Sequence, residues 1–195
     1  MNEQLTDIVF VLDRSGSMGG TIDDYIGGMR TMLDEQREVE GSAKISFYTF
    51  GDYVFQEYLR NDISDAYVRD VQAGGLTAMY DGIGVAIDDL GVALAGLREE
   101  DKPGKVLFVI VTDGWENCSK EYDQADIKDR ITKQTDKYSW EFMFLGANID
   151  SKEVGNSMGV YTTQDYVQSS EGVEGLFSNI SVSTATYRNT GDLNL

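Results

Sequence analysis

The sequence predicts an α/β fold: a doubly wound three-layer sandwich with a mostly parallel central sheet and one antiparallel edge strand. Two observations carry this prediction. The apolar runs at residues 8–12 and 106–111 are continuous rather than alternating, as in strands that are covered on both faces of a parallel sheet. Short apolar runs of this kind also alternate along the chain with patterns of helical spacing, which is typical of βαβ units.

The first predicted helix follows the first strand. Thr21, with Asp24 three positions later, resembles a capping box, so the helix is expected to begin near Thr21. Apolar side chains at helical spacing form its buried stripe: Ile22, Tyr25, Ile26, Met29, Met32 and Leu33.

A hairpin is predicted next. The runs at residues 44–50 and 53–59 are joined by Gly51 and Asp52, a pair suited to a two-residue turn. This hairpin would supply the antiparallel edge strand. The Tyr and Phe residues between positions 47 and 58 are expected to pack in the core and in the hairpin.

Later elements continue the alternation. A second long helix is indicated by a stripe that ends before Pro103, the only proline: Ile83, Ile87, Leu90, Leu94 and Leu97. After the strand at 106–111 we expect, in order, a weaker helix around Ile127 and Ile131, a strand at 140–146, a short helix near Val154, a small strand at 160–162 and a terminal helix over 173–187.

Length and composition favour one soluble globular domain over residues 1–195, with its core at about 5–188 and a short polar tail at 189–195. The 34 acidic and 16 basic residues give a formal charge of -18, which disfavours nucleic acid and anionic membranes as partners. No basic segment followed by a long apolar one is visible at the N-terminus, so we expect a cytoplasmic protein. The sequence does not indicate the oligomeric state.

Cysteine and histidine usage narrows the chemistry. The single Cys118 cannot form an internal disulfide, and the chain has no histidine. Ser-His-Asp and Cys-His catalysis and ordinary zinc sites are therefore excluded, and Cys118 is expected to be inert. Any metal ion must be bound by oxygen atoms.

Oxygen-bearing side chains follow the two central strands. Asp13, Ser15 and Ser17 occupy alternate positions after the first strand, and Gly16 lets the backbone bend between the two serines. Asp113 closes the run VLFVIVTDG, and Thr77 lies in the loop AGGLTAMYDG. Ligand sites in such sheets lie at the carboxyl ends of the strands, so the three loops should converge on one edge.

Two aspartates and three hydroxyls suit Mg2+, which prefers octahedral oxygen coordination and retains several waters. Mn2+ and Ca2+ are also compatible on charge grounds. Because the hydroxyls are neutral, the bound ion would stay electrophilic toward a further anionic oxygen.

The motif DRSGS, with a Thr in a later Gly-rich loop and an Asp in TDG, resembles the metal-ion-dependent adhesion site, or MIDAS, of a von Willebrand factor type A domain. The resemblance covers roughly residues 5–188. It is strongest to compact bacterial and phage members, including the tellurite-resistance-associated group, through LDRSGSM, GGLTAMYDGIG, KVLFVIVTDGWENCS and WEFMFLGANID. It implies the same doubly wound fold and the metal ligands Asp13, Ser15, Ser17, Thr77 and Asp113.

In this family the further oxygen often comes from an Asp or Glu of a partner protein. The resemblance therefore implies a cytoplasmic, Mg2+-dependent protein-binding module that is not an enzyme. Five residues around the metal ligands are expected to form the rim that a partner contacts: Arg14, Met18, Gly75, Trp115 and Glu116. For Trp115, a buried structural role fits the sequence equally well.

Two other functions stay open. A metal-dependent phosphatase of haloacid-dehalogenase type would use Asp13 as its nucleophile, but it expects a second acid where this chain has Ser15. A surface or virion adhesin would use the same metal site, and a signal peptide or a flanking surface module would favour it.

Overall fold

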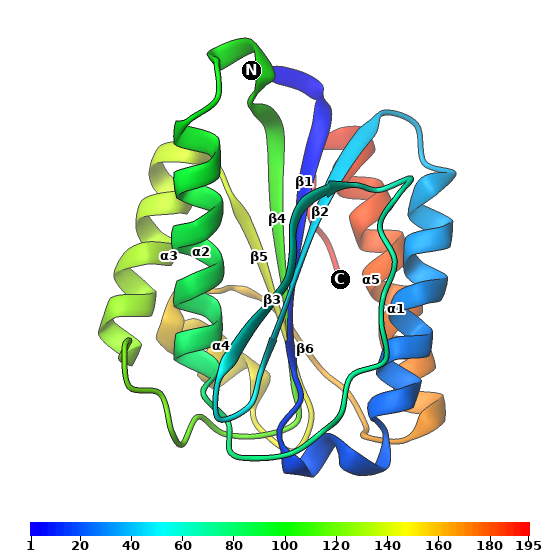
Figure 1. Ribbon diagram of the computed structural model, residues 1–195, viewed down its shortest axis with the longest axis vertical. Helices are drawn as coiled ribbons and strands as arrows, with labels where there is room; N and C mark the ends of the chain where they lie inside the picture. Colours follow the sequence, from blue (N-terminus) through cyan, green and yellow to red (C-terminus); the bar gives the residue numbers. More distant parts are fainter.

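The computed structural model describes residues 1–195 and contains a six-stranded sheet with the strand order β3-β2-β1-β4-β5-β6 (Figure 1). The strands are β1 (Asn2–Asp13), β2 (Ser42–Phe50), β3 (Val54–Asp62), β4 (Pro103–Thr112), β5 (Glu141–Gly146) and β6 (Thr162–Asp165). All neighbouring strands are parallel except β2 and β3. The predicted fold class and its antiparallel edge strand are confirmed.

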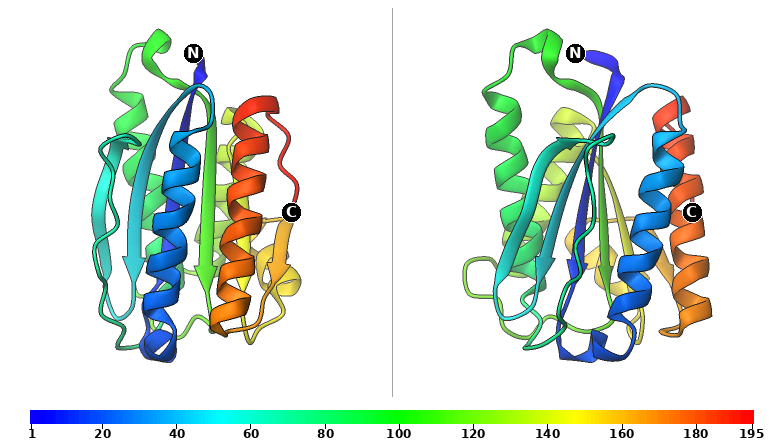
Figure 2. Two further views of the ribbon diagram at one scale, coloured as in Figure 1. Left: turned by 90° about the vertical axis from the view of Figure 1, so that its right-hand side faces the viewer. Right: turned by 45° about the vertical axis from the view of Figure 1, so that its right-hand side comes forward.

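Helices cover both faces of the sheet (Figures 1 and 2). They are α1 (Ile22–Arg37), α2 (Met79–Ala95), α3 (Gln124–Tyr138), α4 (Ser151–Met158) and α5 (Ser170–Thr190), with short 3-10 helices η1 (Gly16–Gly20) and η2 (Glu99–Asp101). The helices α1 and α5 lie side by side on one face, and α2, α3 and α4 lie on the other. None of the helices is both long enough and apolar enough to cross a membrane.

Two hydrophobic layers explain why the central strands are apolar without interruption. In β1, Ile8, Phe10 and Leu12 pack toward α1 and α5, whereas Val9 and Val11 pack toward α2 and α3. Successive side chains of a strand point to opposite faces, so a strand covered on both faces needs apolar residues at every position.

The start of α1 is correct, but the predicted capping box is wrong. Thr21 precedes the helix without a side-chain capping hydrogen bond. Its hydroxyl instead accepts a hydrogen bond from Gln168 Nε2 at 3.4 Å, and Asp24 accepts one from Ser170 Oγ at 2.8 Å. Tertiary contacts with Gln168 and with the first residue of α5 therefore replace the local cap.

The hairpin also differs in detail from the prediction. Phe50 pairs with Val54, so the turn contains three residues rather than two, and Gly51 N donates to the Tyr53 carbonyl at 3.1 Å. Tyr53 is 69% exposed and Phe55 is 42% exposed, so the expectation that the aromatic residues here all pack inside is wrong for these two. They lie at the edge strand, which no further strand covers.

Near the C-terminus the elements are shifted. The last strand is β6, which begins at Thr162 rather than at residue 160, and α5 extends from Ser170 to Thr190, beyond the predicted 173–187. The polar tail is accordingly shorter than predicted. The chain crosses from β6 to α5 at the same edge of the sheet as the ends of β1 and β4 (Figure 2).

Candidate metal centre

The strands β1 and β4 bring the two predicted aspartates to one edge of the sheet. Leu12 pairs with Val111 in a parallel register, so Asp13 and Asp113 emerge next to each other. Both side chains are buried. Thr112 Oγ1 donates a hydrogen bond to Asp13 Oδ2 at 2.6 Å, which fixes the orientation of that carboxylate.

A continuous chain of hydrogen bonds joins four of the five predicted ligands. Ser15 N donates to Asp13 Oδ1 at 2.7 Å, and the Ser15 and Ser17 hydroxyls lie 3.1 Å apart. Ser17 Oγ then donates to Asp113 Oδ1 at 2.6 Å. The alternate positions in the sequence thus converge because η1 begins immediately after Ser15 and turns the chain back toward β4.

Thr77 reaches the same edge through its loop. Gly16 N donates to the Gly75 carbonyl at 3.0 Å, and Thr77 N donates to Asn117 Oδ1 at 2.9 Å. Gly75 has φ +83°, and a Cβ atom there would lie 2.4 Å from Asp52 Oδ2, so the loop conformation requires glycine. Thr77 is buried, but its hydroxyl forms no hydrogen bond with the other four side chains.

These oxygens fit a hard divalent cation. Adjacent ligands of an octahedral Mg2+ with bonds of ~2.1 Å lie about 3 Å apart, close to the hydroxyl and carboxylate separations found here. Burial raises the pKa of Asp13 to about 6, with the nearby Asp113 charge adding to the effect, although hydrogen bonds from Thr112 and Ser15 oppose it. A cation between the carboxylates would offset this unfavourable burial of charge.

Hydroxyls are essential to this arrangement. The chain contains no group of three or more acidic or cysteine side chains placed to hold a metal ion. The two aspartates are therefore the only formal negative charges among the candidate ligands, and any further protein ligands of an ion bound there would be neutral.

Sequence reasoning missed Gln168, which contacts the site from the segment between β6 and α5. Its Nε2 donates to Asp113 Oδ2 at 2.5 Å and to the Ser17 carbonyl at 3.1 Å. Asn148, after β5, donates in turn to Gln168 Oε1 at 2.8 Å. The only sequence signal was their position just after strands that end at this edge.

A second set of contacts lies beneath the aspartates. Tyr166 OH donates to the Thr112 carbonyl at 3.0 Å and lies 2.8 Å from Tyr25 OH. Burial raises the pKa of Tyr25 to about 12, so both phenols stay protonated and support the end of β4 as neutral groups. Thr112 was visible in the TDG motif, but Tyr166 and Tyr25 carried no such signal.

The predicted rim residues have different positions. Trp115 is 57% exposed and Gly75 is exposed, while the half-buried Arg14 places its guanidinium 4.3 Å from the centre of the Phe55 ring. The prediction that Met18 contacts a partner is wrong, because η1 turns its side chain fully into the core beneath α1 and α5.

Glu116 organises its own loop. Its Oε1 accepts hydrogen bonds from Cys118 N at 2.8 Å and Ser119 N at 2.7 Å, and its Oε2 accepts from Tyr80 N at 2.9 Å. Both carboxylate oxygens are thus occupied. Burial raises the pKa of the Cys118 thiol, which agrees with the inert role predicted for it.

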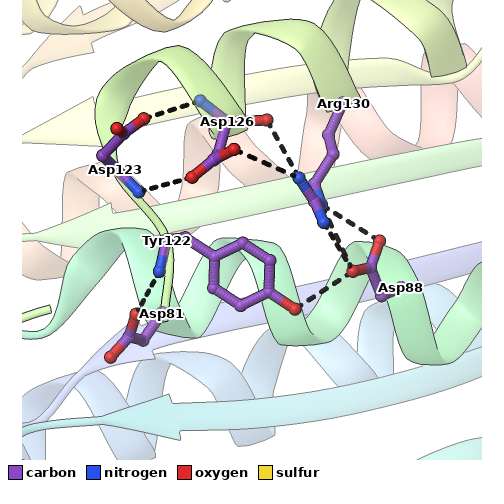
Figure 3. Close-up of polar contacts among 6 residues, drawn as sticks. All are labelled: Asp81, Asp88, Tyr122, Asp123, Asp126 and Arg130. Carbon is purple, nitrogen blue, oxygen red and sulfur yellow. Dashed lines mark hydrogen bonds and ion pairs between the residues drawn. The ribbon is translucent and has the colours of Figure 1, made fainter. Parts of the chain in front are cut away.

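The far end of the loop after Asp113 is anchored between α2 and α3 (Figure 3). Asp81 accepts hydrogen bonds from the backbone N–H groups of residues 120–122 at 2.9 to 3.0 Å. Tyr122 OH donates to Asp88 Oδ2 at 3.0 Å, and Arg130 NH2 donates to the same oxygen at 3.1 Å. The loop is therefore fixed at both ends and presents Trp115 between them.

Comparison with known families agrees with this geometry. The family model of the von Willebrand factor type A domain matches residues 7–176 of this chain. The chain belongs to the von Willebrand factor type A domain family. Members of this family are modules for metal-dependent protein binding and adhesion, and they bind a divalent metal at the MIDAS. No curated protein sequence matches the chain.

Solved structures show the same fold. Proximal thread matrix protein 1 from the mussel byssus, with zinc in its MIDAS motif, is 16% identical with a TM-score of 0.63, and the match covers 92% of this chain and 46% of that one. A mutant of the PilB minor pilin from Streptococcus sanguinis is 13% identical with a TM-score of 0.66, and the match covers 98% of this chain and 64% of that one. The pilus adhesin SpaC from Lactobacillus rhamnosus GG is 12% identical with a TM-score of 0.65, and the match covers 93% of this chain and 30% of that one. The chain spans less than two thirds of the length of each.

Proposed function

We propose that this chain is a protein-binding module without enzymatic activity that presents Mg2+ to an Asp or Glu of a partner protein. The residues that would hold the ion are Asp13, Ser15, Ser17, Thr77 and Asp113. The observation that carries the proposal is the series of hydrogen bonds that runs from the Asp13 carboxylate through the backbone N–H of Ser15 and the two serine hydroxyls to Asp113.

Burial indicates the direction from which the partner approaches. Asp13 and Ser15 are buried, whereas Ser17 is exposed at the edge of the sheet. When bound, the ion supplies a positively charged coordination position on that open side. A carboxylate from a partner would match it, because the other ligands of the chain are neutral hydroxyls and the ion stays electrophilic toward a further anionic oxygen.

The other functions fit less well. A haloacid-dehalogenase-like hydrolase needs a second acid near Asp13, and Ser15 occupies that position. A surface adhesin would use the same metal site, and two of the similar structures are a pilus adhesin and a minor pilin. We favour the cytoplasm because the only cysteine, Cys118, is a free thiol.

Calorimetric titration with Mg2+ tests the proposal. We expect one site, with Asp13→Ala weakening binding about 100-fold or more and Ser15→Ala weakening it less, because only the first change removes charge as well as an oxygen. The matched control is Asp129→Ala, because Asp129 is an exposed aspartate on α3 whose side chain forms no hydrogen bond or ion pair. Unchanged binding in Asp13→Ala, or turnover of a phosphate ester that is lost in this variant, would contradict the proposal.

A further inference from the structure

Large apolar side chains are exposed beside the candidate metal centre. Tyr53 and Phe55 at the β2–β3 turn are 69% and 42% exposed, and Leu76 in the Gly-rich loop is 54% exposed. Leu76 N donates to Asp52 Oδ1 at 2.8 Å, which joins the Gly-rich loop to the turn. We call Tyr53, Phe55 and Leu76 the hairpin flank.

Two cations lie on the aromatic rings of the hairpin flank. The Arg14 guanidinium is 4.3 Å from the Phe55 ring centre, and Lys120 Nζ is 6.0 Å from that of Tyr53. Neither cation forms an ion pair, although the chain has a net charge of -18. Arg14 Nε is buried and has no hydrogen-bond partner. This surface therefore combines apolar area with positive charge that the chain leaves unpaired.

The sheet sets the distance between the hairpin flank and the metal ligands. Asp13 pairs with Phe50 on β2, and Phe50 pairs with Val54 on β3. Neighbouring strands lie ~4.8 Å apart, so the flank is roughly 10 Å from Asp13 across the edge of the sheet. An extended segment advances ~3.3 Å per residue and covers that distance in about three residues.

We propose that the hairpin flank is a second contact surface for the partner bound at the metal. Its occupant is an extended acidic segment in which a large apolar side chain lies about three positions from the Asp or Glu on the ion. The apolar side chain packs on Tyr53, Phe55 and Leu76, and Arg14 receives an oxygen of the same segment. This inference rests on the proposed function, because the metal fixes the register of the segment.

The contact is made through side chains rather than by addition of a strand to β3. The pairing of β2 with β3 shifts register between Ile45 and Tyr48, and Arg60 has φ +54°. Such irregularities twist an edge strand and disfavour pairing with another chain.

Selection from random short peptides displayed on phage tests the inference. The whole chain is immobilised in Mg2+, and bound phage are released with a chelator. We expect enriched peptides to contain Asp or Glu with Phe, Tyr, Trp or Leu about three positions away. A synthetic peptide of the enriched sequence should bind Phe55→Ala about tenfold more weakly than the unchanged chain, while the affinity for Mg2+ alone stays the same.

The matched control is Tyr161→Ala. Tyr161 is 79% exposed and precedes β6, the edge strand on the opposite side of the sheet from β3, so its replacement should not affect the peptide. Enriched acidic peptides without the apolar preference, or full affinity in Phe55→Ala, would overturn the hairpin flank and leave the metal-dependent function intact. Absence of any peptide released by the chelator, or equal peptide binding by Asp13→Ala, would overturn both.

Discussion

Charged side chains are buried at both ends of the central sheet, but the groups that surround them differ. At the metal end, Asp13 and Asp113 face hydroxyl groups, and neither forms an ion pair. At the other end, the buried Arg188 donates from its NH2 group to the carbonyls of Val39 at 3.3 Å and Gly41 at 3.1 Å.

The opposite end also contains a polar pocket of about 220 Å³ beside Arg188. Lys105 Nζ donates there to the Arg188 carbonyl at 2.9 Å and to the Glu3 carbonyl at 3.3 Å. Backbone carbonyls thus solvate the cations as soon as the chain folds. At the cationic end, backbone carbonyls accept hydrogen bonds from both terminal nitrogens of Arg188, although its Nε has no partner. At the carboxylate end the chain supplies no cation, so an added one would balance the charge.

The largest expected effect is the increase in the free energy of unfolding that Mg2+ causes through the end of the sheet with Asp13 and Asp113. Mg2+ at about 100 times its dissociation constant should raise the free energy of unfolding by about 2.7 kcal/mol, because only the folded chain assembles the ligands. Asp113→Ala should remove this increment. Denaturant unfolding with Mg2+ or chelator measures it, and an equal increment in Asp113→Ala would contradict the difference between the two ends.

A smaller effect is expected at the cationic end. Arg188→Met removes the donors to the carbonyls of Gln36, Val39 and Gly41, and it should lower the free energy of unfolding by about 2 kcal/mol. The increment from Mg2+ should not change. Lys152→Met, at an exposed position, is the control for loss of a positive charge. Loss of the Mg2+ increment in Arg188→Met would show that the two ends are coupled.

From the sequence, Asp13, Ser15 and Asp113 could be named because they lie at or just after the ends of buried strands, and Thr77 because its loop resembles the family motif. Gln168 could not, because its contact with Asp113 joins two distant loops. Met18 was misplaced because a short 3-10 helix has no apolar period that reveals which side chain turns inward.

The extent of burial explains why the central strands were easier to predict than the hairpin. Apolar runs predicted the central strands well, because burial on both faces dictates every residue in them. At the edge strand β3 only one side is constrained, so the pattern does not distinguish aromatic residues packed on the core, such as Tyr58, from exposed ones such as Phe55. The hairpin flank therefore became apparent only from the structure.

The smallest effect is expected at Gln168, which supports the metal end without being a ligand. Its amide donates to Asp113 Oδ2 at 2.5 Å and to the Ser17 carbonyl at 3.1 Å, so it restricts two of the three loops that would hold the ion. Groups that orient a ligand in this way contribute to metal affinity by limiting its rotation. We expect Gln168→Ala to weaken Mg2+ binding about tenfold, or ~1.4 kcal/mol.

Calorimetry with Gln168→Met separates the hydrogen bonds from packing, because methionine is similar in length but has no amide. It should lose as much Mg2+ affinity as Gln168→Ala, while Gln72→Ala, at an exposed position without side-chain hydrogen bonds, should lose none. Full affinity in Gln168→Met would mean that Asp113 is oriented without the amide. The metal end would then be defined by Asp13, Asp113 and the hydroxyls of their neighbouring loops, and the segment before α5 would only pack against it.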